Sequence, residues 1–111
     1  MIKLQEEKSK INFDSISEEQ LKAKLAEYRQ MIDEIDDELK KNLSARVELI
    51  EAVAEIKRYL GSSTFDAKRE EEIFNRISEQ LEGNKLHYVR NVFERIIDES
   101  RSLQRKILGR K

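Results

Sequence analysis

The feature that most constrains the fold is the segment 18–60, which contains neither proline nor glycine. Apolar side chains recur along it mostly at alternating spacings of three and four residues, the pattern of a helix with one apolar stripe. The stripe consists of Leu21, Leu25, Tyr28, Ile32, Ile35, Leu39, Leu43, Val47, Ile50 and Ala54. Such a helix is about 65 Å long, whereas a compact chain of 111 residues is only about 35 Å across. The stripe would stay exposed unless another chain covers it, so we predict an intertwined homodimer.

Sequence signals mark both ends of this predicted helix. Ser17 and Gln20 form a capping box, in which each side chain accepts a hydrogen bond from the backbone of the other residue. Ile16 and Leu21 stand at the positions of a hydrophobic staple around that box. Gly61 follows the last helical residue and suits the left-handed conformation that often ends a helix. The predicted helix therefore lies between Ser17 and Gly61.

Two shorter helices are predicted in the rest of the chain. Thr64 or Asp66 can cap a second helix that runs to about Glu82. Gly83 then breaks the chain before a third helix over about 85–108. Their apolar faces consist of Ile73, Phe74, Ile77 and Leu81 in the second helix, and of Leu86, Val89, Phe93, Ile96, Ile97, Leu103 and Ile107 in the third. We predict an all-α fold with three helices per chain, the first very long.

The composition agrees with a single helical domain over residues 17–111, preceded by a charged leader, residues 1–16, that we expect to be flexible. Charged residues make up 41% of the chain, and proline is absent, which is typical of long helices. The net charge of −1 argues against a general nucleic-acid-binding protein. No apolar run approaches the length of a membrane span, and the absence of cysteine excludes a thiolate metal site. We expect a cytoplasmic protein without metal or cofactor.

The long helix presents three cations in two directions. Arg46 and Lys57 are eleven residues apart and point almost the same way, and Val53 shares their face. Arg29 lies seventeen residues before Arg46, so it is about 25 Å further along the axis and roughly 100° away around it. If all three cations serve one ligand, Arg29 must come from a second copy of the chain.

Polar residues on the other two helices interrupt positions that should be apolar. Ser100 and Gln104 fall in the stripe of the third helix, and Arg69 lies on the inner side of the second helix, beside Glu70. Buried cations are costly unless a ligand or an acidic partner supplies negative charge, and arginine suits bidentate binding of carboxylates. The sequence therefore predicts a cationic pocket between helices for a small molecule with two or more carboxylates.

These residues, in this order, resemble the all-helical chorismate mutase family. The motifs that carry the resemblance are 28–36 (YRQMIDEID), 43–46 (LSAR), 53–57 (VAEIK), 66–70 (DAKRE) and 96–104 (IIDESRSLQ). The resemblance as a whole covers almost the entire chain, from about residue 23 to 108. The resemblance implies a homodimer with two shared active sites, which rearranges chorismate to prephenate on the route to phenylalanine and tyrosine, the shikimate pathway. It implies no cofactor.

The resemblance also implies a role for each residue. Arg46 and the partner chain's Arg29 would bind the two substrate carboxylates. Lys57 would contact a carboxylate and the ether oxygen, and Gln104 would donate to the same ether oxygen. Arg69 would support the cationic environment. The remaining expected contacts are Glu70 and the backbone near Asp66 to the ring hydroxyl, Ser100 to a carboxylate, and Val53 and Ile97 as the apolar wall.

Three alternatives stay open at this point: the two described next, and a plain dimeric coiled coil that binds no ligand. The first is an isochorismate pyruvate-lyase on the same scaffold, which would use a similar pericyclic pocket. The second is a non-catalytic or regulatory helical interaction module, and a free-standing chain of this kind could also dock onto another pathway enzyme.

Overall fold

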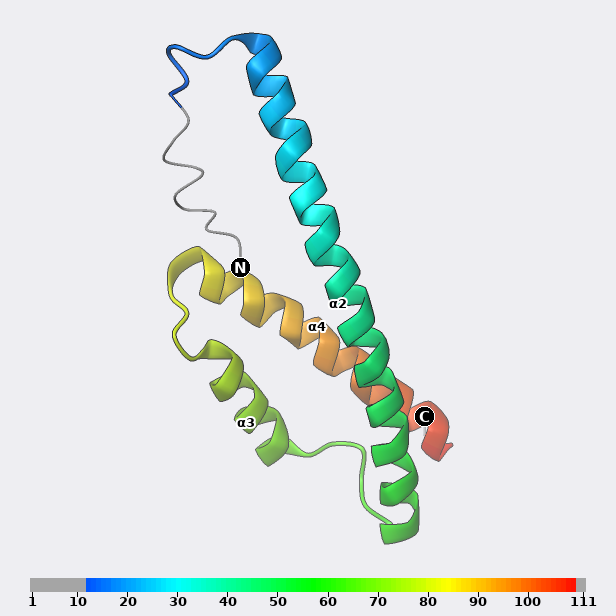
Figure 1. Cartoon of the computed structure of the whole chain (residues 1–111). Coiled ribbons are helices and arrows are strands. Elements are labelled where there is room, and N and C mark those ends of the chain that lie inside the picture. Colours follow the sequence, from blue (N-terminus) through cyan, green and yellow to red (C-terminus); the bar gives the residue numbers. More distant parts are fainter. Residues whose placement is uncertain (1–11, 110–111) are drawn as a thin grey trace. The chain divides into compact units, whose positions relative to one another are not determined.

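The computed structural model describes residues 12–109, and this part of the chain is helical without any strand. Its elements are α2 (Glu18–Leu60), α3 (Ala67–Ser78) and α4 (Gly83–Leu108), coloured along the sequence in Figure 1. The predicted all-helical class and the very long first helix are confirmed. Most of the predicted leader lies outside the described residues. None of the described helices is long and apolar enough to cross a membrane.

The ends of α2 form as the local signals predict. The backbone N–H of Ser17 donates to Gln20 Oε1 at 2.9 Å, and the N–H of Gln20 donates to Ser17 Oγ at 3.1 Å, which completes the capping box. At the other end Gly61 has φ +68°, and the N–H of Ser62 donates to the carbonyl of Lys57 at 2.9 Å. This Schellman arrangement satisfies carbonyls that the helix leaves without partners.

The chain divides into two units, residues 1–42 and residues 43–111. In the first unit α2 carries its apolar stripe with little cover. Leu25, Ile32 and Leu39 are each about half exposed. Apolar side chains at this spacing and exposure leave an apolar face that the chain itself does not bury.

The second unit contains the core. α3 and α4 lie side by side in Figure 1, joined by a short turn. Ala54 of α2, Ile73 of α3 and Ile97 of α4 are the buried apolar residues of the described part, one from each helix. Ser100 and Gln104 on α4 are buried as well. The polar interruptions predicted in the α4 stripe are therefore interior positions.

The turn between α3 and α4 differs from the prediction. α3 ends at Ser78, not near Glu82, and α4 begins at Gly83 itself, two residues before the predicted start. Ser78 Oγ donates to the carbonyl of Phe74 at 2.6 Å, an alternative to the helical backbone bond, and Gln80 adopts φ +62°. The polar side chain of Ser78 and the left-handed Gln80 end the helix one turn before its apolar pattern does.

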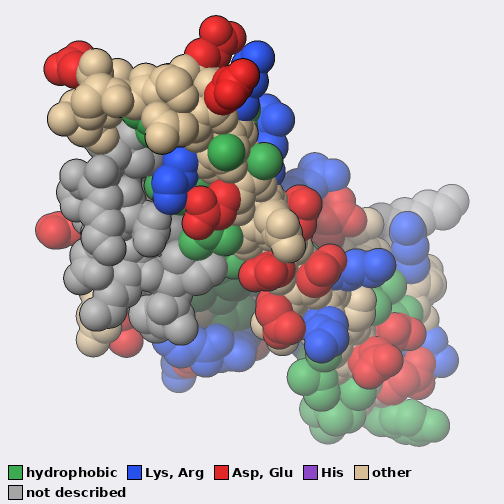
Figure 2. Space-filling view, turned by 45° about the horizontal axis from the view of Figure 1, so that its top comes forward, with side chains coloured by type: hydrophobic (Ala, Val, Ile, Leu, Met, Phe, Trp, Pro, Cys, Tyr) green, Lys and Arg blue, Asp and Glu red, His purple; other side chains and the backbone are tan. Residues whose placement is uncertain are grey.

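Charged side chains of both signs are interspersed on the visible face of the molecule, with apolar side chains between them (Figure 2).

Candidate active site

A cavity of about 340 Å³ lies within the second unit. The C-terminal part of α2, the loop before α3, and α3 and α4 all contribute to its wall. Its lining residues are Arg46, Leu49, Ile50, Val53, Lys57, Thr64, Asp66, Arg69, Glu70, Ile73, Ile97, Ser100, Arg101 and Gln104. Nine of the ten residues predicted for the site are among them. The tenth, Arg29, belongs to the first unit.

Arg46 is held by Ser100, one of the polar residues that interrupt the apolar stripe of α4. Its guanidinium donates to Ser100 Oγ, and that hydroxyl donates in turn to the carbonyl of Ile96 at 2.8 Å. Ser100 is only 7% exposed, so Arg46 reaches it by entering the helix interface. Burial first, and then the charge of Arg69, lowers the pKa of Arg46 from its ordinary value. Burial and the neighbouring cation therefore disfavour the charged form of Arg46. An anion bound beside it would offset this cost.

Lys57 and Gln104 form a second pair in the same wall. Lys57 Nζ donates to Gln104 Oε1 at 2.8 Å and to the carbonyl of Thr64 at 3.2 Å. Gln104 is 6% exposed and points inward from α4. Because its amide oxygen accepts from Lys57, its amide nitrogen is the end left to donate. The lysine thus holds the amide oxygen of the glutamine, and both side chains line the cavity.

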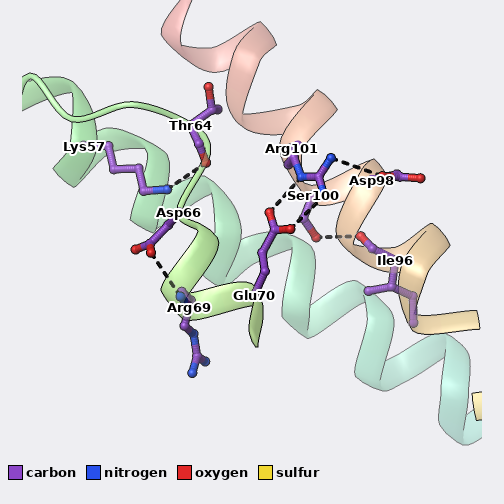
Figure 3. Close-up of polar contacts among 9 residues, drawn as sticks. All are labelled: Lys57, Thr64, Asp66, Arg69, Glu70, Ile96, Asp98, Ser100 and Arg101. Atoms are coloured by element: carbon purple, nitrogen blue, oxygen red, sulfur yellow. Dashed lines mark hydrogen bonds and ion pairs between the residues drawn. The ribbon is translucent and has the colours of Figure 1, made fainter. Parts of the chain in front are cut away.

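The N-cap and the first turn of α3 each contribute one carboxylate to the lining of the cavity, and Figure 3 shows the contacts of both. Asp66 caps α3 by accepting from the N–H of Arg69 at 3.0 Å. Glu70 accepts two hydrogen bonds from Arg101, each of 2.7 Å. Arg101 was not predicted as a site residue, although it lies three residues before Gln104 and so on the same side of α4.

Arg69 departs from the prediction in one respect. It lines the cavity, but its side chain is 53% exposed and forms an ion pair of 3.5 Å with Glu72, whereas the sequence pattern predicted an inward, half-buried residue. The long arginine side chain follows the surface of α3 and keeps its guanidinium in water. Arg69 therefore acts on the site mainly through its charge.

The balance of charge around the cavity favours a dianion. Four cations and two carboxylates line it, which leaves an excess of two positive charges. The apolar part of the wall includes Ile97, 3% exposed, and Val53, 40% exposed. In the described part of the chain no group of three or more His, Cys, Asp or Glu side chains could hold a metal ion. The site can bind and orient a small anionic molecule and donate hydrogen bonds to it.

Comparison with known proteins identifies the family. The sequence profile of the family "Chorismate mutase type II" matches residues 28–105, which include every predicted site residue. The chain is also 36% identical over 87 residues to a protein named "Chorismate mutase" from Methanocaldococcus jannaschii, an alignment that covers 77% of this chain and 88% of that protein. All residues that line the cationic cavity lie within the matched segment. This chain belongs to the chorismate mutase type II family.

Proposed function

We propose that the chain is an isomerase, a chorismate mutase, which converts chorismate to prephenate in aromatic amino-acid biosynthesis. The observation that carries the proposal is the pairing of Lys57 with Gln104 at 2.8 Å inside a cavity with an excess of two positive charges. Chorismate carries two carboxylates and one ether oxygen. The cavity offers cations for the carboxylates and two convergent donors for the oxygen.

The chemistry explains why this cavity needs no general base or nucleophile. The reaction is a unimolecular rearrangement in which the enolpyruvyl group folds over the ring into a compact geometry. Cations that bind the carboxylates favour this geometry and lower the entropic part of the barrier. As the C–O bond breaks, negative charge grows on the ether oxygen. Donors aimed at that atom, Lys57 and Gln104, stabilise the transition state more than the bound substrate.

The other lining residues receive supporting roles in this proposal. Arg46 binds one carboxylate, and Ser100, which accepts from Arg46, lies within reach of the same group. Glu70 and the backbone near Asp66 hold the ring hydroxyl. Arg69 contributes charge at the edge of the cavity, and Val53 and Ile97 contact the ring as an apolar wall.

A direct assay tests the proposed reaction. The purified chain is mixed with chorismate, and the loss of its ultraviolet absorbance is followed together with the formation of prephenate. We expect turnover that Lys57→Ala abolishes. In a parallel reaction with isochorismate, release of pyruvate would instead indicate a lyase, and the absence of activity on either substrate would favour a non-catalytic interaction module.

We further propose that residues 17–111 act as one domain within a cytoplasmic, intertwined homodimer. The half-exposed stripe of Leu25, Ile32 and Leu39 supports the dimer because it offers a long apolar face at helical spacing. Of the other two arginines in the cavity wall, Arg69 is 53% exposed and Arg101 is paired with Glu70, which supports a contribution from Arg29 of the other copy. Docking of this dimer onto another pathway enzyme remains a prediction.

Subunit complementation tests the shared site. Arg29→Ala and Arg46→Ala chains should each be inactive alone, but a heterodimer of the two contains one site with both arginines. Random exchange at equal concentration makes half of the dimers heterodimers, so about a quarter of the wild-type activity should return. Demonstrated exchange without any recovery would refute the shared site while leaving the reaction itself intact.

A further inference from the structure

The contact between Glu70 and Arg101 differs in geometry from the surface ion pairs of this chain. Arg101 Nε and Nη2 each lie 2.7 Å from one oxygen of the Glu70 carboxylate, a two-point contact across 31 positions of sequence (Figure 3). The two side chains are 29% and 17% exposed. By contrast, the pair between Arg95 and Glu99 on α4 is 77% and 64% exposed. An arginine that donates to both oxygens, here called the fork, balances the charge of a partly buried carboxylate and also fixes its orientation.

Arg101 is itself fixed from several sides. Asp98 lies 3.4 Å from Nη1, and the ring centroid of Phe65, in the loop before α3, lies 5.5 Å from the guanidinium carbon. The hydrogen bonds with Glu70, followed by the charges of Glu70 and Asp98, raise the pKa of Arg101 despite partial burial. The cation thus has a set position between α4, α3 and the loop.

The fork leaves Glu70 able to bind a ligand. A carboxylate offers about four acceptor sites, and Arg101 occupies one on each oxygen. Glu70 lines the cavity, and its neighbour Arg69 forms its ion pair with Glu72 instead. The remaining acceptor sites of Glu70 are therefore available to a hydroxyl group in the cavity.

We infer that Arg101 is a positioning residue, which holds the Glu70 carboxylate in the orientation that accepts the ring hydroxyl of the substrate. This inference rests on the proposed function. The ring hydroxyl does not take part in bond breaking, so its contact is similar in the bound substrate and in the transition state. Loss of such uniform binding raises KM more than it lowers kcat. Arg101 acts through Glu70, not on the reacting atoms.

A double-mutant cycle tests the inference in the full-length chain. Arg101→Met and Glu70→Gln are each expected to lower kcat/KM by about tenfold to a hundredfold, mainly through KM, as expected for a lost hydrogen bond to a charged group. The double variant should be no worse than Glu70→Gln alone, because Arg101 has no carboxylate left to position. Arg105→Met, an exposed arginine one turn further along α4, is the matched control and should leave both constants unchanged.

Different results refute different statements. An inactive wild-type chain refutes the proposed function. Suppose that the wild type is active. If the losses in kcat/KM of the two single variants multiply in the double variant, Arg101 contacts the substrate directly. If folded Arg101→Met has the KM of the wild type, the pair with Glu70 is merely structural. Either result overturns the inference. If Arg101→Met fails to fold, Arg101→Lys keeps the charge without the fork, and a KM equal to that of the wild type then overturns it as well.

Discussion

Replacement of Lys57 by methionine tests the role that this residue has in the proposed catalysis. The lysine has two tasks in the structure: it offers a charged donor to the cavity, and it holds Gln104 Oε1 at 2.8 Å. Loss of one preorganised donor to a developing oxyanion costs about 10²–10³ in kcat, or about 2.7–4 kcal/mol. Without Lys57 the Gln104 amide can also rotate, so the second donor is weakened. We therefore expect kcat to fall at least about a hundredfold.

The same replacement should keep the chain folded, with only a modest loss of stability. Lys57 is a half-buried cation close to other cations, and methionine fills a similar volume without a charge. Because the buried Gln104 Oε1 loses its donor, we expect the free energy of unfolding, from urea titration, to fall by no more than about 1–3 kcal/mol. The control is Lys85→Met, an exposed lysine in the first turn of α4, which should keep wild-type kcat.

Two results would contradict this reasoning. If kcat of Lys57→Met stays within about tenfold of the wild type, Lys57 is not a donor to the transition state. If Gln104→Ala costs as much in the Lys57→Met background as in the wild type, the lysine does not orient the glutamine.

Three further predictions concern charge, pH and backbone. Arg46→Leu should lose activity while its unfolding free energy stays unchanged or rises, because burial and the charge of Arg69 already disfavour this cation; a large fall in stability on urea titration would contradict this. The value of kcat should be nearly flat from about pH 5 to 8 because the Gln104 amide does not titrate, whereas Gln104→Glu should make the pH profile fall as the new acid ionises. Gly61→Ala should lower the unfolding free energy by about 1 kcal/mol with no change in kcat, because φ is +68° there although space for a Cβ is open.

Much of the fold could be predicted from sequence because its signals are local. The capping box of Ser17 and Gln20, the left-handed Gly61 and the spacing of the α2 stripe each depend on residues within one or two turns. The end of α3 could not be predicted as well. Its apolar pattern continues to Leu81, but Ser78 bonds to the backbone and ends the helix earlier.

The buried polar positions could be predicted where a polar residue interrupts an apolar stripe. Ser100 and Gln104 interrupt an apolar stripe, and both are buried against cations from α2. Arg69 was predicted less well, since a long side chain at an inward position can still follow the helix surface into water. Arg101 was missed because an arginine near Asp98 has the pattern of an ordinary surface pair.

By itself the sequence determined the number of helices, the two ends of α2 and the set of polar residues that a plain helical core does not need, because these follow from spacing along one chain. Only the tertiary structure decided which of those residues meet. The contacts of Arg46 with Ser100, Lys57 with Gln104 and Arg101 with Glu70 join positions 31 to 54 residues apart. Helical periodicity sets the direction in which each side chain leaves the axis of its helix. Which residue it meets across an interface depends on how the helices pack.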